Sequence, residues 1–519
     1  MSGNYDVIVI GSGLGGLTAG ALAARAGYQV LVLERNQSVG GAASVYQQDE
    51  LSIEASLHET TDPHNPQDPC HRIFATLGIL DDIQYVPVDN FYEVRGKLFK
   101  KPFVLPHGMQ AARSALQSHF PKHARVLDTL FERFKKSDQF MGLLSTSHSG
   151  LWWLFNLPRL VVKFWPVLRD IKKSLAEVFQ QLFADDEAIK IALAANLGYY
   201  ADDPDRLWWF FFAMAQGGYL RGGGYYIHGG SQVLSNCLVK VIEASGGSVK
   251  TSRPVTRILL DEQGKACGVE HEHREGGDIQ TAYAPVLFGN AAPHVLASAL
   301  PADVRGDFMH IYDNRPLSLS LFSISLGIAH PPATFGVSSY STIIVPDWMA
   351  SLGDTRFNAD LLHGLPGERC PMLTIVDYSR IDSGLNVKPP YLLSIVGFDR
   401  LANWQSLSDE DYHHKRDQWL EAIIHWVDEE YPGLAEAITQ KSMSTALSMH
   451  RYLNTPEGAI YGFAPVPPER ISLKESPYTP KTTIDGLWLA SSYANGGGFT
   501  GAIISGASAA SMALNLKQE

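Results

Sequence analysis

The sequence predicts an α/β protein in which one parallel sheet is assembled from separate parts of the chain. Three observations predict this fold. A strand, glycine turn, helix and strand open the chain at 6–34, and a strand, glycine-rich turn and helix close it at 486–514. The residues between these two units show helical patterns in some segments and the alternating pattern of strands in others. With 519 residues, 45% of them hydrophobic, the chain is long enough for two domains.

The first of these units has the features of a nucleotide-binding site. Residues 6–10 are almost wholly apolar, which is typical of a strand buried on both faces of a parallel sheet. An Ala- and Leu-rich helical pattern then runs to Arg25, and a second apolar run at 29–33 ends at Glu34. Between the first strand and the helix stand Gly11, Ser12, Gly13, Leu14, Gly15 and Gly16.

The glycines and the acid each have a physical role in such a unit. Gly11 permits the tight turn, Gly13 lets the backbone approach a pyrophosphate, and Gly16 lets the helix pack closely on the strand. The helix N-terminus presents free N–H groups and a positive dipole end to the phosphates. Glu34 stands where an acid accepts a hydrogen bond from a ribose hydroxyl, and its charge would repel a 2′-phosphate. The sequence therefore predicts a Rossmann-like dinucleotide site that does not take NADP.

The C-terminal unit extends this prediction. Residues 486–490 form a second buried strand pattern, and a small-residue helix is expected from about Ala502 to Leu514. The glycine-rich turn between them contains Gly498, Phe499 and Thr500. The N-terminus of such a helix would stabilise negative charge on a bound cofactor, and the small residues would allow close packing on the first helix.

Several segments resemble the phytoene desaturase, carotenoid isomerase and retinol saturase group of flavoproteins, in the amine oxidase-like superfamily. The resemblance covers nearly the whole length and rests on an acid–Arg–x4–Gly–Gly arrangement and on three later stretches, 221–231, 429–434 and 457–463. It implies an FAD cofactor, with the backbone at Val255 against adenine. Motif and resemblance together give the cofactor-binding residues Gly11, Gly13, Leu14, Gly15, Gly16, Glu34, Arg35, Gly40, Gly41, Ala42, Val255, Asn290, Ser491, Gly498, Phe499 and Thr500.

Two departures from the group's pattern put its subclass in question. Ala490-Ser491-Ser492 stands where many flavoproteins of this class carry Gly-Asp. Residues 51–59 take the place of the group's acid–x–Gly segment, and His58 matches a histidine of the saturase branch.

The predicted fold class is thus α/β, with a discontinuous two-dinucleotide-binding FAD domain and an α+β substrate domain with a mainly antiparallel sheet. The FAD domain is expected at 1–70, 215–300 and 475–519, and the substrate domain at 71–214 and 301–474. Strands of the second domain are expected at 318–325, 372–378 and 391–398, where β-rich apolar patterns occur.

The middle of the chain contains two strongly apolar, aromatic stretches. Residues 151–168 mix Trp and Phe with Arg159 and Lys163, as interfacial helices do, and contain two prolines. We expect this broken, charged segment to touch a membrane surface without spanning it, although ordinary helix core is an equally good interpretation. Residues 207–214 are expected to line or back a substrate tunnel.

Few residues suggest chemistry of their own, because a flavin would carry the hydride step. His58 with Glu54 or Glu59 is the first candidate for acid–base work, against the alternative that His58 only holds a loop. Tyr461 and Tyr226 are candidate walls beside the ring, or simply packed aromatics. The candidate catalytic residues are therefore His58, Glu59 and Tyr461.

Charge and spacing exclude other classes. A net charge of −12 without a basic block argues against nucleic acid, and the four cysteines have no paired spacing. No set of side chains has the spacing of a metal site, and no second glycine fingerprint offers a nicotinamide site. The N-terminus lacks a signal-peptide pattern, so we expect a cytoplasmic protein with peripheral membrane contact.

The expected function is oxidoreduction or rearrangement of carbon–carbon bonds in a long apolar lipid, with a carotenoid or retinoid polyene as the leading substrate. A desaturase of membrane fatty acyl chains, a flavin amine oxidase and a non-enzymatic lipid-binding flavoprotein are alternatives. The sequence does not distinguish desaturation, saturation and isomerisation, and leaves the electron acceptor or donor and the oligomeric state open.

Overall fold

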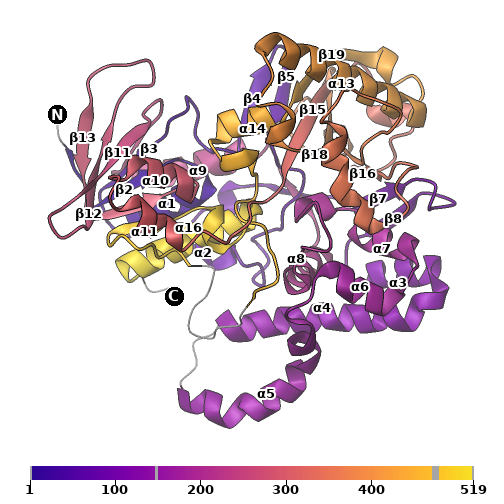
Figure 1. Ribbon diagram of the computed structural model, residues 1–519, viewed down its shortest axis with the longest axis horizontal. Helices are drawn as coiled ribbons and strands as arrows, with labels where there is room; N and C mark the ends of the chain where they lie inside the picture. Colours follow the sequence, from indigo (N-terminus) through magenta and orange to yellow (C-terminus); the bar gives the residue numbers. More distant parts are fainter. Residues whose placement is uncertain (1–2, 146–149, 470–478, 517–519) are drawn as a thin grey trace.

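The computed structural model describes residues 3–145, 150–469 and 479–516 (Figure 1). A five-stranded parallel sheet lies at the centre of one part. Its strand order is β10 (Ser248–Lys250), β3 (Val30–Leu33), β2 (Val7–Ile10), β14 (Val286–Gly289) and β20 (Leu487–Leu489). The N-terminal and C-terminal parts of the chain thus meet in one sheet, because β14 pairs with both β2 and β20.

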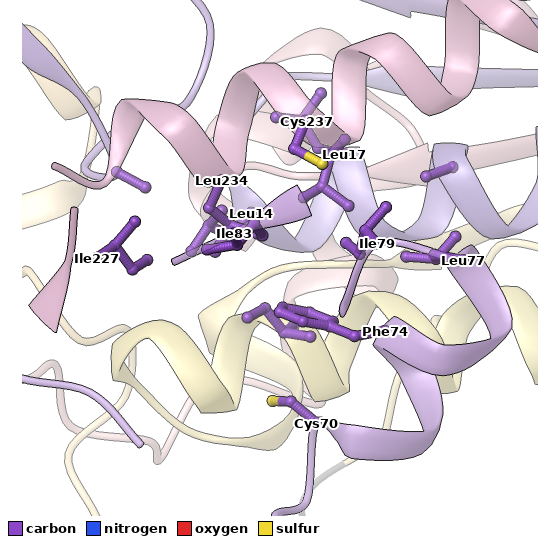
Figure 2. Packing of buried hydrophobic residues seen from close by; sticks show 14 of the residues in the cluster. Leu14, Leu17, Cys70, Phe74, Leu77, Ile79, Ile83, Ile227, Leu234 and Cys237 are labelled. Atoms are coloured by element: carbon purple, nitrogen blue, oxygen red, sulfur yellow. The ribbon is translucent and has the colours of Figure 1, made fainter. Parts of the chain in front are cut away.

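The two faces of this sheet are buried by different layers. Alternate side chains such as Val7 and Val30 pack toward the helices α1 (Leu14–Arg25), α9 (Gln232–Ala244) and α16 (Gly498–Leu514). Ile8 and Leu31 point to the other face, where the hairpins β11 (Val255–Leu260), β12 (Ala266–His271) and β13 (Gln280–Tyr283), and helix α10 (Pro293–Ala299), cover them. Figure 2 shows Leu14 and Leu17 of α1 packed with Leu234 of α9 and with Phe74 of α2 (His71–Leu77).

A seven-stranded, mainly antiparallel sheet forms the centre of the other part. Its order is β19 (Ile438–Ser444), β15 (Ser320–Ile328), β18 (Tyr391–Asp399), β17 (Leu373–Asp377), β16 (Ser341–Ile344), β7 (Asn90–Arg95) and β8 (Phe103–Pro106). Only β16 and β7 pair in parallel among these strands. Phe322, Ile324 and Ile395 pack on one face against helix α13 (Asp409–Glu430), while the alternate residues Leu321, Val396 and Phe398 line a cavity on the other.

Helices from residues 109–222 pack beside that sheet. They are α3 (Met109–His119), α4 (Ala124–Ser145), α5 (Gly150–Asp170), α6 (Leu175–Phe183), α7 (Glu187–Ala194) and α8 (Trp209–Gly222). Of these, α4, α5 and α8 contribute residues to the cavity lining. Helix α5 is the outermost of them and projects from the body beside α4 (Figure 1). Its C-terminal residue Asp170 is buried and accepts hydrogen bonds from Arg133 and Lys173 at 2.9 and 2.7 Å.

The fold confirms the predicted α/β class, with one parallel and one mainly antiparallel sheet. All strands of the parallel sheet fall inside the segments expected for the FAD domain, and all strands of the seven-stranded sheet fall outside them. The domain boundaries themselves stay a prediction.

Two local expectations were wrong. Helix α16 begins at Gly498, earlier than expected, with Gly497 as its N-cap, so Gly498, Phe499 and Thr500 form its first turn. Segment 151–168 is not broken, because α5 runs through Pro158 and Pro166. The carbonyl that Pro166 leaves free belongs to Val162 on the exposed face of the helix, where solvent can satisfy it. Among the described residues, no helix combines the length and hydropathy needed to cross a bilayer.

Candidate functional site

A large cavity connects the two parts of the molecule. Its volume is 2060 Å³. It runs from the first turns of α1 and α16, past the inner face of the seven-stranded sheet, to residues of α4, α5 and α8. Ligand pockets for one molecule usually measure about 300–1,000 Å³, so this space can hold more than one.

Two helix N-termini open into one end of this cavity without side-chain caps. Gly13 precedes α1 and Gly497 precedes α16, and among the described residues neither N-terminus has a side-chain cap hydrogen bond. Such paired, uncapped N-termini suit an anionic ligand. A Cβ added at Gly13 would lie 2.6 Å from Asn290 Oδ1, so only glycine leaves the backbone approachable there.

The second glycine pair lies directly on the first glycine turn. The Gly40 N–H donates to the Ser12 carbonyl at 2.9 Å, and Gly40 and Gly13 form a parallel bridge. The loop therefore lies beside the first glycine turn, and its approach to a dinucleotide stays a prediction. A Cβ at Gly40 would meet the Ala43 carbonyl and lie 2.7 Å from Ser235 Oγ.

Glu34 is buried at the end of β3 and is held by the glycine turn. Its Oε2 accepts hydrogen bonds from Ser12 N and Ser12 Oγ at 2.8 and 2.7 Å, and its Oε1 accepts one from Asn36 N at 2.7 Å. The carboxylate also lines the cavity, where its remaining lone pairs can accept a ribose hydroxyl.

Replacing Glu34 by Ala is therefore expected to weaken FAD binding without unfolding the protein. One lost charge-assisted hydrogen bond costs about 1.5–3 kcal/mol, so the dissociation constant should rise by about 10- to 150-fold. Titration of the deflavinated protein with FAD measures this change. Glu262→Ala, at an exposed position, is the matched control, and an affinity within about threefold of wild type for Glu34→Ala would refute the role.

The structure brings nearly all the predicted cofactor residues to this cavity. Its lining includes Gly11, Gly13, Leu14, Gly15, Glu34, Arg35, Gly40, Gly41, Ala42, Val255, Asn290, Ser491, Gly498, Phe499 and Thr500. Gly16 does not line it. A Cβ there would lie 2.5 Å from the Gly11 carbonyl oxygen and 2.7 Å from Asn290 Cβ, which fits the packing role expected for Gly16.

Arg35 has a structural partner in addition to its place in the lining. Its guanidinium donates to the carbonyls of Arg451 and Tyr452, in the last turn of α14 (Ala446–Leu453). Burial lowers its pKa, while the Glu34 carboxylate opposes this change. The contact ties the nucleotide end of the cavity to the part that carries the seven-stranded sheet.

The opposite end of the cavity is apolar and aromatic. Helix α8 contributes Phe210, Phe211 and Met214 from the aromatic run 207–214, and the role of this part as a substrate tunnel stays a prediction. The cavity then reaches α4 and the end of α5, at Phe140, Met141, Leu144, Leu168 and Ile171.

The candidate acid–base residues lie together but pair differently from the expectation. His58 lines the cavity, and burial lowers its pKa to about 4, so its imidazole is neutral near pH 7. Glu54 lies behind the wall and is fully engaged: Ser231 N and Oγ donate to it at 2.8 and 2.6 Å, and the hydroxyl of Tyr226 donates at 3.2 Å. The carboxylate beside His58 in sequence, Glu59, instead faces His107.

Glu59 and His107 form a buried pair. His107 Nε2 lies 2.9 Å from Glu59 Oε1, and the side chains are 11% and 1% exposed. The contact is a close approach of the imidazole to the carboxyl group, and neither carboxyl oxygen has a hydrogen bond of good geometry among the described residues. Burial raises the pKa of Glu59, and His107 opposes this rise.

The two candidate tyrosines lie in different places relative to the cavity. Tyr461 lines the cavity, and its Cβ packs on Gly497 at the N-terminus of α16; burial raises its pKa to about 12. Tyr226 is fully buried, is hydrogen-bonded to Glu54 and does not line the cavity, so it is the packed aromatic that the sequence offered as the alternative.

Sequence reasoning missed His107 and the tyrosines Tyr199 and Tyr219. His107 follows β8 directly and lies far from Glu59 in the chain. Only the glycine run 222–224, whose last residue Gly224 packs on the Glu59 carboxyl, could have indicated a close approach here.

Known proteins resemble this chain over most of its length. A family model described as flavin containing amine oxidoreductase matches residues 14–283, just over half of the chain. An all-trans-retinol 13,14-reductase of Macaca fascicularis is 26% identical over 481 residues, which cover 88% of this chain and 77% of that protein. A chloroplastic prolycopene isomerase of Daucus carota is 23% identical over 500 residues, 94% of this chain and 76% of the isomerase.

One solved structure illustrates the likeness in fold. An oxidoreductase from Methanosarcina mazei aligns with a TM-score of 0.62 over 98% of this chain and 100% of its own. Its sequence identity is 16%, so the likeness concerns the fold alone.

Proposed function

Because the chain belongs to the family of flavin-containing amine oxidoreductases and is an FAD-dependent oxidoreductase, we propose that it saturates a carbon–carbon double bond of a long apolar polyene. The observation that carries this proposal is the continuity of the cavity, which joins a dinucleotide cradle to an aromatic tunnel. Similarity to retinol reductases supports saturation as the direction.

Different residues along the cavity would bind different parts of the cofactor and the substrate. The N-termini of α1 and α16, with Glu34, would hold the phosphates and the ribose. When bound, FAD supplies a two-electron hydride donor or acceptor. Phe211, Met214 and Phe398 form the apolar wall that binds and orients a hydrocarbon chain and excludes water.

The products of a single turnover test this function. Purified holoprotein is reduced under anaerobic conditions, mixed with all-trans-retinol in detergent, and the extracted lipid is analysed by mass spectrometry. A product with two added hydrogens supports saturation. An unchanged mass with altered geometry, or no product together with peroxide release from amines in air, would contradict it.

We also propose that the substrate enters from a membrane on which α5 lies. On one face of α5, Phe155, Val162 and Trp165 are 75%, 78% and 57% exposed, opposite the buried Phe164 and Val167. Met141 and Leu144 of α4 are also exposed and line the cavity, so an apolar substrate would reach the cavity past these side chains. Arg159 and Lys163 flank the apolar surface of α5, as cations do at headgroup depth.

Vesicle flotation tests this surface. Combined substitution of Phe155, Val162 and Trp165 by Ser should lower the membrane-bound fraction at least about tenfold, since burying each such side chain contributes about 1.5–3 kcal/mol. The matched control replaces Ile279, Leu365 and Val387, which are 61%, 58% and 71% exposed elsewhere. Equal flotation of both triple variants on phosphatidylcholine–phosphatidylserine vesicles would refute membrane contact through α5.

A further inference from the structure

The wall of the cavity carries one buried acid that the binding of cofactor and substrate does not use. Glu59 is 1% exposed at its side chain and has no hydrogen-bond donor on either oxygen among the described residues. Glu59 is nevertheless one of the residues that line the cavity, with its carboxyl oxygens covered just behind the wall. A buried carboxyl with free hydrogen-bonding capacity is costly unless it serves a purpose, because desolvation is not offset.

The fold makes room for this carboxyl at a specific place. A Cβ at Gly224, between α8 and β9 (Tyr225–Ile227), would overlap the carboxyl of Glu59 and lie 2.5 Å from His107 Cε1. Gly224 does not have a left-handed φ, so backbone conformation does not demand a glycine there. The glycine is therefore required by the position of the Glu59 side chain.

The carboxyl is linked to the flavin end of the cavity by aromatic side chains. The Glu59 carboxylate raises the pKa of both Tyr199 and Tyr219, after the larger effect of burial, and Tyr461 acts on the same two hydroxyls. Tyr461 in turn packs on Gly497 at the N-terminus of α16. On the other side, Phe91 stacks on Tyr219 and contacts the ring of His107, with centroids 5.4 Å apart in each case.

We propose that Glu59 is the catalytic acid that delivers the proton in double-bond saturation, and that His107 is its positioning residue; this inference rests on the proposed function. One carbon of the double bond takes a hydride with both electrons of the new bond, supplied by the reduced flavin. Its neighbour takes the proton: the O–H bond of Glu59 breaks, its electron pair stays on the carboxylate oxygen, and the π pair forms the second C–H bond. Solvent then reprotonates the carboxylate, and His107 stabilises it in the meantime.

Burial favours the protonated acid that this step needs, because it raises the pKa of Glu59. The titratable groups that act on or face Glu59 are His107, Tyr199, Tyr219 and Tyr340. The tyrosine pKa values are raised by burial, so the hydroxyls stay neutral. The saturation rate should therefore be constant at low pH and fall as pH rises through the pKa of Glu59.

The test combines turnover with a readout that needs no substrate. In single turnovers of all-trans-retinol by the reduced holoprotein, Glu59→Gln should form the dihydro product at least about 100-fold more slowly and lose the alkaline limb. His107→Phe should slow product formation and move that limb to higher pH, since His107 lowers the pKa of Glu59. His107→Gln should keep more of the wild-type rate than His107→Phe. Infrared difference spectra between low and high pH should show a buried carboxylic acid band in wild type that Glu59→Gln lacks.

The controls separate this inference from the proposed function. Glu50→Gln, at an exposed position, should behave as wild type. If Glu59→Gln loses its flavin, Gly224→Ala decides, because it keeps the acid but displaces it, and it should slow product formation at least about tenfold. A wild-type rate in either variant, or no carboxylic acid band in wild type, would overturn the inference while the dihydro product still upheld saturation. Absence of the dihydro product from wild type would overturn both.

Discussion

Replacing Gly506 by Val is expected to yield a protein with markedly lower thermal stability and little bound flavin. Gly506 is buried in α16 where this helix crosses α1. A Cβ there would overlap the Gly15 carbonyl and lie 3.1 Å from Ala19 N. These neighbours are backbone atoms, which cannot turn aside, so the two helices must move apart.

The expected magnitude follows from overpacking. Added methyl groups in a tight core cost about 1–3 kcal/mol or more, and separation of α1 from α16 also moves both N-termini that face the cofactor. Thermal unfolding followed by circular dichroism, with flavin content per chain, measures both effects. Gly306→Ala is the control, since its added Cβ meets nothing within 4 Å, and it should be neutral or stabilising by about 0.5–1 kcal/mol. Wild-type stability and flavin content in Gly506→Val would contradict the close helix contact.

Replacing Met214 by Asp is expected to slow turnover of a polyene strongly while leaving FAD in place. Met214 lies on α8 in the apolar part of the cavity and packs with Phe164 and Phe210, away from the glycine cradle. When a hydrocarbon binds beside it, a carboxyl at this point loses its water and gains no hydrogen bond in return. That penalty is about 2–7 kcal/mol for a polar group, so kcat/KM should fall at least about 30-fold.

Met214→Leu is the matched control, because a volume-conserving apolar change costs less than about 1.5 kcal/mol. Rates of retinol turnover and flavin absorbance are measured for both variants. A Met214→Asp protein that turns over retinol as fast as Met214→Leu would show that the hydrocarbon does not lie along α8.

Much of the cofactor end could be predicted because its signals are local. The strand, turn, helix and acid of 6–34 lie in one stretch, and each glycine has a backbone reason that the sequence shows. Strands β15, β17 and β18 also lie where their β-rich apolar patterns predicted them. The family match confirms the predicted resemblance and the FAD cofactor.

The residues that could not be predicted meet only through tertiary packing. Glu59 follows β5 (Leu51–Glu54), whereas His107 follows β8, and α8 with Gly224 brings the two together. Nothing in either local sequence indicates that the two residues pair. Because His58 adjoins Glu59 in the chain, the sequence suggested His58 as the partner of Glu59 in place of His107. The start of α16 was missed for a different reason, since a glycine-rich stretch resembles a loop until its helical hydrogen bonds are seen.

Anaerobic stopped-flow absorbance is the most direct test of the central claim, that one cavity holds FAD and a polyene in contact. Reduced holoprotein is mixed with all-trans-retinol in detergent micelles, and the oxidised flavin band is followed. We predict that this band returns at a rate that saturates with retinol concentration, and that Met214→Asp strongly slows the response while Met214→Leu keeps it. Failure of retinol and of every other polyene to reoxidise the flavin, with reduction of the oxidised protein by an amine instead, would contradict the account.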